Sequence, residues 1–329
     1  MMSNKILSIS VAAYNVEKWL RGTLESCIIN DKNQEYLEVI IVNDGSSDDT
    51  YNIALEYQNK YPELFKVVNK KNGGYGSTIN SAVKVAEGKY FKILDGDDWY
   101  NTKELSCFID RLKMCDEDVV FTNYVRVNEN NEELDRISIG ECIPNIKYDF
   151  MSKNKINWAM HGISVKTNLM RRHEIKISEH CFYTDAEFVT NVMRYMETYR
   201  FFDYYIYRYR VGRNGQSVSR EGLTKHKQDS VRVLKKELEL YNEIGENEKK
   251  RKIIGNYIIQ SARFALNGYL ISIHDKDSKS EWIELDLWIK ENFPEIYNEM
   301  EKKKEIWLMR KLKYNFFILF RFNALRKFK

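Results

Sequence analysis

Short apolar runs alternate with longer segments of helical spacing over the first 127 residues. The apolar runs predicted as strands are Ile6–Ala13, Leu37–Val42, Phe65–Val68, Tyr90–Leu94 and Asp118–Val127. The segments between them with an apolar side at helical spacing are Glu17–Ile29, Asp48–Tyr61, Ser77–Ala86 and Lys103–Met114. Strands that alternate with helices of about a dozen residues predict βαβ units and a mainly parallel sheet flanked by helices.

The pattern changes in the second half of the chain. Residues 128–133 are rich in Asn and Glu and predict a hairpin turn, and Trp158–Lys166 predicts a strand on the acceptor side of a site. From about residue 222 only helical spacing remains, in Lys225–Ile244, Lys252–Ile273 and Glu281–Asn292. We therefore expect an α/β domain over 1–221 and a helical C-terminal region over 222–329.

Composition narrows the class of protein. Hydrophobic residues make up 43% of the chain and charged residues 30%, which indicates a folded chain with a core. The five cysteines are odd in number and form no CxxC pair, so reduced thiols are expected and a disulfide framework or zinc site is not. No signal peptide and no apolar stretch of the roughly 18 residues that span a membrane is present, which favours a cytoplasmic protein.

Polar and glycine-rich motifs follow the predicted strands where each strand ends. They are Ala13-Tyr14-Asn15, Asp44 with Gly45-Ser46, Asn72-Gly73-Gly74 and Asp95-Gly96-Asp97-Asp98. In an open parallel sheet the ligand crevice lies beyond the carboxyl ends of the strands, so these motifs are expected in one site.

Each motif has a chemical and a purely structural interpretation. Carboxylates at Asp95 and Asp97 suit a hard divalent cation that also binds phosphates. Asp44 can accept hydrogen bonds from a base or ribose, Tyr14 can stack on a nucleobase, and the glycine loop before a helix favours an anion. Taken singly, the same pieces are equally explained by capped turns, a tight loop and a buried edge tyrosine.

Together the motifs resemble family 2 glycosyltransferases with the GT-A, Rossmann-like fold. The matching pieces, in order and spacing, are Ser10–Asn15, Asp44–Thr50, Asn72–Asn80 and Asp95–Asp98, followed by Tyr183–Phe188 and Tyr207–Ser219. The resemblance covers residues 5–125 well and about two-thirds of the chain in all. Thr184 stands where many members have Glu, and Thr78-Ile79-Asn80 where many have Ala-Arg-Asn, which leaves the donor sugar open.

The resemblance implies roles for named residues. It places Mn²⁺ or Mg²⁺ on Asp97 and makes Asp185 the general base that accepts the acceptor hydroxyl proton. His161 and Asp98 are expected on the acceptor side. The positions expected to bind the donor, a UDP-sugar, are Ala13, Tyr14, Asn15, Asp44, Asn72, Gly73, Gly74, Asp95, Gly96, Arg213 and Gln216.

Charge is concentrated at the C-terminus. The chain carries +4 in total, of which residues 301–329 contribute +8 and the remaining residues −4. Residues 305–329 mix cations with aromatic and aliphatic side chains, which is typical of a peripheral membrane contact, or of a helix docked on its own domain or on a sister subunit. A nucleic-acid partner is not expected, because the body is acidic and lacks a nucleic-acid motif.

The sequence thus predicts an inverting, metal-dependent glycosyltransferase. It would move a hexosyl or N-acetylhexosaminyl group from a UDP-sugar to a glycan or lipid-linked acceptor in surface polysaccharide, capsule or wall polymer synthesis. A nucleotidyltransferase on a similar sheet would carry a glycine-rich basic loop after the first strand, which Ala12–Asn15 lacks. The remaining alternative is a non-catalytic sugar-nucleotide-binding or scaffold protein of a polysaccharide assembly complex.

Overall fold

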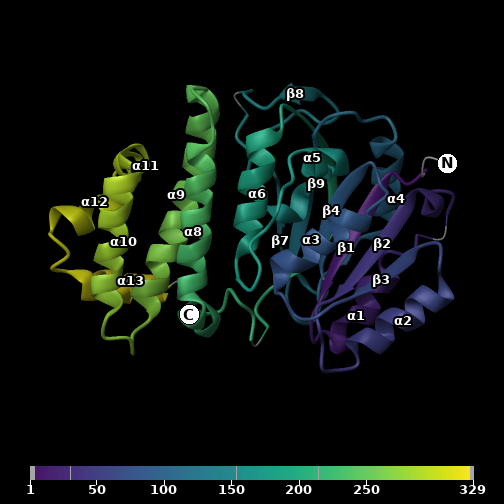
Figure 1. Cartoon of the computed structure of the whole chain (residues 1–329), viewed down its shortest axis with the longest axis horizontal. Helices are drawn as coiled ribbons and strands as arrows, with labels where there is room; N and C mark the ends of the chain where they lie inside the picture. Colours follow the sequence, from purple (N-terminus) through teal and green to yellow (C-terminus); the bar gives the residue numbers. More distant parts are fainter. Residues whose placement is uncertain (1–3, 30, 153, 214, 327–329) are drawn as a thin grey trace. The chain divides into compact units, whose positions relative to one another are not determined.

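The computed structural model describes residues 4–29, 31–152, 154–213 and 215–326. The chain forms two compact units, Met1–Arg213 and Asn214–Lys329 (Figure 1). A turn before the first helix of the second unit caps that helix. The Ser219 side chain accepts a hydrogen bond from the backbone N–H of Gly222, and Ser219 N–H donates to the carbonyl of Gln216.

The first unit is built on one mixed sheet. Its strands follow the spatial order β3-β2-β1-β4-β9-β6-β10-β5, with β7 added beside β6 and β8 beside β10. Their bounds are β1 (Leu7–Ala13), β2 (Leu37–Asn43), β3 (Phe65–Asn69), β4 (Tyr90–Asp95), β5 (Trp99–Tyr100), β6 (Val119–Val127), β7 (Glu133–Ile137), β8 (Lys147–Asp149), β9 (Ile163–Lys166) and β10 (Thr198–Arg210). Strands β3, β2, β1 and β4 are parallel, as the sequence pattern predicts.

The strand predicted over Trp158–Lys166 is shorter than expected. A 3₁₀ turn, η2 (Met160–Gly162), replaces its first part, and β9 then runs antiparallel to both β4 and β6. This reversed strand contributes to the mixed sheet, and the turn η2 before it places His161 near β4.

Helices cover both faces of the sheet. Their bounds are α1 (Glu17–Glu25), α2 (Thr50–Lys60), α3 (Tyr75–Val85), α4 (Thr102–Leu112), α5 (Thr167–Arg172) and α6 (Thr184–Tyr195), with the 3₁₀ turn η1 (Gln34–Tyr36) before β2. Alternate strand residues such as Ile9, Val11 and Ile41 share one core with α1, α2 and α4. Helix α3 packs against β1 and β2 and touches α5 and α6.

Strand register brings the predicted site together. Ala13 lies beside Asn43, Ala12 beside Asp95, and Asn43 beside Asn69. Because these strands are parallel, the turns that follow them leave the sheet at one edge. The tightly packed strands therefore fix the position of the polar motifs.

The second unit is helical, as predicted. It contains α7 (Arg220–Lys225), α8 (Lys227–Asn242), α9 (Glu248–Ile271), α10 (Ser278–Asn292), α11 (Pro294–Met300), α12 (Lys304–Lys311) and α13 (Phe317–Arg326). The long helix α9 is its centre and contacts α7, α8, α10, α11 and α13. Across the described part of the chain, every helix is too short or too polar to traverse a lipid bilayer.

A buried ion pair fastens α12 to α10. The Arg310 guanidinium, 5% exposed, lies 2.7 Å from the Asp286 carboxylate, which is fully buried. Arg310 also donates to the carbonyl of Tyr297 at 2.8 Å, and Tyr314 donates to Asp286 at 3.2 Å. The first half of the predicted tail is therefore docked on its own unit.

We predict that Asp286→Ala lowers the free energy of unfolding by about 3–5 kcal/mol, because it leaves the Arg310 charge buried without its partner. Denaturant unfolding measures this change. Lys302→Ala, which removes an exposed pair with Glu299, is the matched control and should cost less than about 1 kcal/mol. Equal effects of the two substitutions would contradict the role given to the buried pair.

Candidate active site

Asp44 organises the glycine loop that follows β3. Its carboxylate is 2% exposed and accepts hydrogen bonds from the backbone N–H groups of Gly73 at 2.9 Å and Gly74 at 2.8 Å. Lys70 adds an ion pair at 2.7 Å, and the Asn72 amide donates to the Asp44 carbonyl at 2.9 Å. The predicted residues Asp44, Asn72, Gly73 and Gly74 thus form one structure at the sheet edge.

Two glycines are required by close packing. Gly74 has a φ of +82°, and a Cβ there would lie 3.1 Å from the backbone nitrogen of His180. A Cβ on Gly96 would lie 2.7 Å from the carbonyl oxygen of Ala12, a distance shorter than van der Waals contact. Gly96 thus lets the acidic turn lie directly against the end of β1, and its predicted contact with the donor stays a prediction.

The turn after β1 reaches across to the turn after β2. The Asn15 side chain accepts a hydrogen bond from Ser47 N–H at 2.9 Å, and Asn15 itself has a φ of 52°. Tyr14 is 51% exposed at this edge, so the interpretation of a buried edge tyrosine is wrong. Its exposed ring can meet a flat ligand, whereas Ala13, the residue before it, is fully buried.

Asp95, Asp97 and Asp98 are held by side chains from distant elements. Tyr75 donates to Asp95 at 2.6 Å, and Asp97 lies 2.5 Å from the Arg213 guanidinium. The buried Asp98 accepts hydrogen bonds from the Tyr207 hydroxyl and from the backbone N–H of Arg210, both at 2.7 Å. Tyr75, Tyr207 and Arg210 lie within the matching sequence motifs, but the sequence analysis gave these three residues no role.

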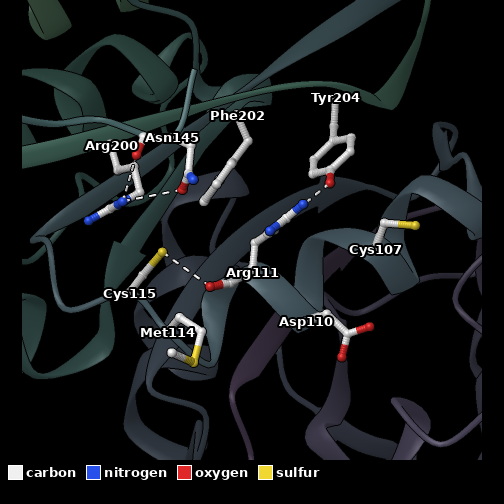
Figure 2. Close-up of a pocket in the computed structure, with 9 residues that line it drawn as sticks. All are labelled: Cys107, Asp110, Arg111, Met114, Cys115, Asn145, Arg200, Phe202 and Tyr204. Atoms are coloured by element: carbon white, nitrogen blue, oxygen red, sulfur yellow. Dashed lines mark hydrogen bonds between the residues drawn. The ribbon is translucent and has the colours of Figure 1, made fainter. Parts of the chain in front are cut away.

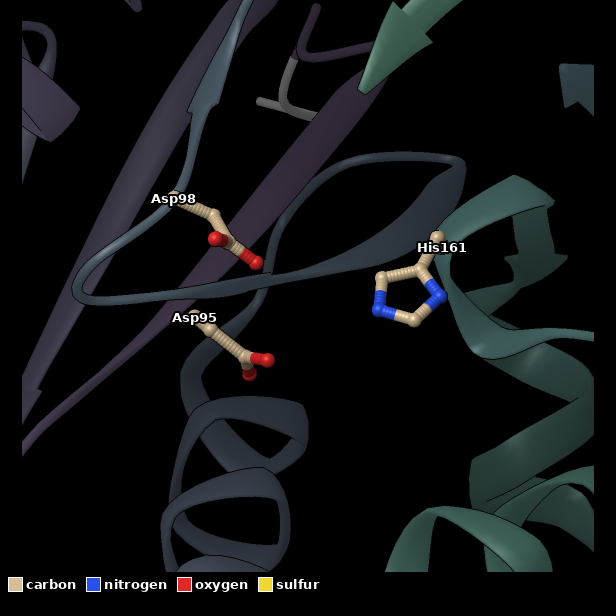
Figure 3. A group of neighbouring side chains, drawn as sticks. All are labelled: Asp95, Asp98 and His161. Atoms are coloured by element: carbon tan, nitrogen blue, oxygen red, sulfur yellow. The ribbon is translucent and has the colours of Figure 1, made fainter. Parts of the chain in front are cut away.

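His161 completes a group of potential metal ligands with Asp95 and Asp98. One ligand atom from each lies within 4.8 Å of the other two, and Figure 3 shows the imidazole facing the two carboxylates. The ring packs among tyrosines, with Tyr209 at 4.3 Å and Tyr207 at 4.8 Å between ring centroids. Its buried Nδ1 has no hydrogen-bond partner among the described residues.

The electrostatics of this group suit a divalent cation. Burial and the charge of Asp97 raise the pKa of Asp95 to about 7, and burial with the charges of Asp97 and Asp95 raises the pKa of Asp98 well above its usual range. Burial lowers the pKa of His161 to about 3, so its ring is a neutral ligand at physiological pH. Two carboxylates that repel each other and a neutral imidazole with an unpartnered nitrogen fit a bound divalent cation.

Asp185 belongs to the same electrostatic neighbourhood. It lies in the first turn of α6, and its charge raises the pKa of Asp95. The residue is exposed by surface area, but the protein around its carboxyl desolvates it and raises its pKa. Glu187, two residues on, is buried and accepts hydrogen bonds from Ser178 N–H at 3.1–3.2 Å, so it supports the fold.

Lys92 lies beneath the site and fixes the position of His161. Its side chain is fully buried on β4 and donates to the carbonyls of His161 at 2.7 Å and Ile163 at 3.3 Å. Burial lowers the pKa of the Lys92 ammonium to about 7. The signal in the sequence that could have marked this position is a lysine inside the apolar run Tyr90–Leu94, because lysines are seldom buried.

Gln216 belongs to the second unit, and its predicted contact with the donor stays a prediction. An open hollow of about 440 Å³ lies elsewhere in the first unit, between α4 and β10 (Figure 2). Its Arg200 is paired with Glu117 at 2.6 Å, and its Arg111 donates to Tyr204 at 3.4 Å. Arg200 stands near the start of β10, whereas the acidic turn contacts the end of that strand, so the hollow is not the predicted site.

The family model for glycosyl transferase family 2 matches residues 8–176, more than half of the chain. The chain belongs to this family. The matched region includes the glycine loop, the acidic turn and His161, and it ends before Asp185. The family match therefore includes the predicted donor side of the site, and the residues after 176 lie outside it.

Two proteins of Bacillus subtilis are similar to part of this chain. A putative glycosyltransferase EpsH of Bacillus subtilis is 39% identical over 98 residues, 30% of this chain and 28% of the relative. The minor teichoic acid biosynthesis protein GgaB of Bacillus subtilis is 40% identical over 95 residues, 29% of this chain and 11% of the relative. The matches span less than a third of either relative's length.

The fold of nearly the whole chain is shared with a solved structure. The crystal structure of residues 1–349 of S. aureus TarS in complex with UDP-GlcNAc has a TM-score of 0.73 and covers 98% of this chain and 92% of its own. The sequences are 20% identical, so this likeness shows the fold. It confirms a GT-A type α/β unit followed by helices in the family 2 chain.

The shifted pKa of Asp95 predicts a pH dependence of stability without metal. A carboxyl with a pKa of about 7 in the folded chain and about 3.9 when unfolded binds its proton more tightly in the folded state. The free energy of unfolding in the presence of a chelator should therefore fall as the pH rises from about 4 to about 7. Denaturant titrations across this range measure the slope.

Asp95→Asn should flatten that slope, because the amide stays uncharged at every pH. The exposed Asp110→Asn is the control and should leave the slope of the parent protein unchanged. Identical slopes for the parent and Asp95→Asn would show that Asp95 ionises normally in the folded chain.

Proposed function

We propose that this family 2 protein transfers a sugar from a UDP-sugar to a hydroxyl of a glycan or lipid-linked acceptor in wall or surface polymer synthesis. The observation that carries the proposal is the meeting of the Asp44-bound glycine loop with the Asp95–Asp98 turn at one sheet edge. The name of GgaB supports the polymer context, the name of EpsH supports the transferase activity, and the UDP-GlcNAc bound to TarS supports the donor class.

The donor would lie along the carboxyl ends of β1, β2 and β4. The exposed ring of Tyr14 would stack on the base of the donor. Asp44, which lies beside the glycine loop, would accept hydrogen bonds from the base or the ribose. Arg213 is paired with Asp97 and is suited to a diphosphate, because a guanidinium donates two hydrogen bonds to phosphate oxygens. An incoming diphosphate would give Arg213 an alternative partner and leave Asp97 available to a cation.

The chemistry that a divalent cation supplies here is stabilisation of the negative charge that develops on the leaving diphosphate. Asp97 would be its principal ligand, as the family resemblance implies. Asp95, Asp98 and His161 offer further donor atoms beside it. Mn²⁺ and Mg²⁺ both fit oxygen-rich ligands, and Mn²⁺ also accepts an imidazole nitrogen.

Asp185 would act as the general base. Its carboxylate would take the proton of the acceptor hydroxyl as that oxygen bonds to the anomeric carbon and the bond to the diphosphate breaks. A single displacement inverts the configuration at that carbon. The raised pKa of Asp185 brings its basicity closer to the working pH, which favours proton transfer.

We predict that Asp97→Asn abolishes the increase in UDP affinity that Mn²⁺ produces, because a neutral amide is a poorer ligand for a hard cation. Calorimetric titration of UDP with and without Mn²⁺ measures this difference, and Asp110→Asn serves as the unaffected control. If Asp97→Asn kept the Mn²⁺ effect while His161→Gln lost it, the cation would belong to the group of Asp95, Asp98 and His161 instead.

We predict that Asp185→Asn lowers turnover by about 10²–10⁴-fold and leaves UDP affinity unchanged, because only proton transfer is removed. Release of UDP from a panel of UDP-sugars with acceptors and Mn²⁺ measures turnover. Glu174→Gln, an exposed acid before α6, is the control. Full turnover by Asp185→Asn would assign the base to another residue, and no turnover by the parent protein on any donor would favour a binding or scaffold role.

A further inference from the structure

Helix α13 carries apolar side chains on its outward side. Ile318, Leu319 and Phe322 are 65%, 60% and 62% exposed, and their spacing places them on one side of the helix. A surface helix of a soluble unit normally presents polar side chains to water and apolar ones to the core. We call Ile318, Leu319 and Phe322 the α13 face.

The α13 face is held outward by contacts on the opposite side of the helix. Phe317 and Ala324 are buried there. Arg321 donates to the carbonyls of Leu270 at 3.1 Å and Ser272 at 3.3 Å, and to the Ser278 hydroxyl at 2.5 Å. The buried side chains and the hydrogen bonds of Arg321 both hold this side of α13 against its own unit. The helix therefore cannot turn its apolar face inward without breaking these contacts.

Cations flank this face. Lys276 and Lys279 are exposed and, with Ile318, line an open hollow of about 350 Å³. The acidic Asp275 at the same hollow is paired with Lys227. The tail adds further positive charge, since residues 301–329 carry +8 in the sequence, although Asp286 neutralises Arg310 and Glu299 pairs with Lys302. Exposed apolar side chains thus stand beside two exposed lysines that form no ion pair with any residue the structure describes.

We propose that the α13 face binds the surface of an anionic phospholipid bilayer. The three apolar side chains would enter the boundary between headgroups and acyl chains, and Lys276 and Lys279 would meet lipid phosphates. The helix is ten residues long and would lie in the plane of the interface. Such a small apolar area gives weak, reversible attachment, which depends on the anionic lipid for part of its strength.

A second copy of the chain fits this face less well. Two-fold pairing would bring the same patch of each copy together, and with it the lysines and the positively charged tail of each. Like charges so placed repel, whereas a bilayer of anionic lipids attracts them. The inference rests on α13 and its surroundings and is independent of the proposed transfer reaction.

Vesicle flotation with the full chain tests the apolar part. The parent protein should float with vesicles of phosphatidylcholine and phosphatidylglycerol and not with phosphatidylcholine alone. Ile318→Ser/Leu319→Ser/Phe322→Ser should weaken the partition coefficient roughly tenfold or more, since each buried aliphatic or aromatic side chain contributes strongly. Leu287→Ser, a 47% exposed apolar position on α10, is the matched control and should bind like the parent.

Charge variants test the electrostatic part. Lys276→Gln and Lys279→Gln should each reduce binding about fivefold, as expected for a basic residue near an anionic surface. Lys249→Gln/Lys252→Gln, exposed lysines at the opposite end of α9, should leave it unchanged. Circular dichroism confirms that every variant is folded.

Two results would overturn the proposal. One is that the parent protein does not bind anionic vesicles, or that the triple serine substitution leaves its binding unchanged. The other is a parent protein that is dimeric in solution and becomes monomeric in the triple variant, without vesicle binding by either, which would assign the α13 face to a second copy. Because flotation needs no sugar donor, its outcome is separate from that of the transfer assay.

Discussion

Repulsion among the carboxylates of Asp95, Asp97 and Asp98 is the constraint on which the site depends. They follow one another in a single turn at the end of β4, where burial strengthens every electrostatic interaction. The first unit balances them with donors from far along the chain: Tyr75 on α3, Tyr207 and Arg210 on β10, and Arg213 after it. The acidic turn therefore keeps its shape only because β10 returns to the end of β4.

These donors do not fully compensate the charge of the three carboxylates, and the charge that is left would bind a cation. The pKa of Asp95 stays raised to about 7 and the pKa of Asp98 is also raised well above its usual range, so without a cation protonation partly relieves the repulsion. His161 adds a neutral imidazole with a buried, unpartnered nitrogen, positioned through the hold of Lys92 on its carbonyl. A cation and a diphosphate would complete a charge arrangement that the protein alone leaves unfinished.

Asp44 shows the opposite arrangement. Its carboxylate is satisfied by two backbone N–H groups of the glycine loop and by Lys70, so its first task is to fix the shape of the loop. A contact between the UDP-sugar and Asp44 would use the oxygen lone pairs of Asp44 that these hydrogen bonds do not occupy. The proposed site thus combines a rigid half around Asp44 with an electrostatically demanding half around Asp95–Asp98.

The sequence by itself determined the alternation of strands and helices, the parallel order of the first strands and the edge at which Asp44, Gly73 and Asp95 meet. Those features follow from local periodicity and from the rule that parallel strands end together. Only the tertiary structure decided that Tyr75, Tyr207 and Lys92 support the site and that His161 faces Asp95 and Asp98. It also decided that α12 is docked through Arg310 while α13 presents apolar side chains outward. These contacts are between residues that lie tens of positions apart in the sequence. Periodicity shows which side of a helix or strand is apolar, but it does not show which other element packs against that side.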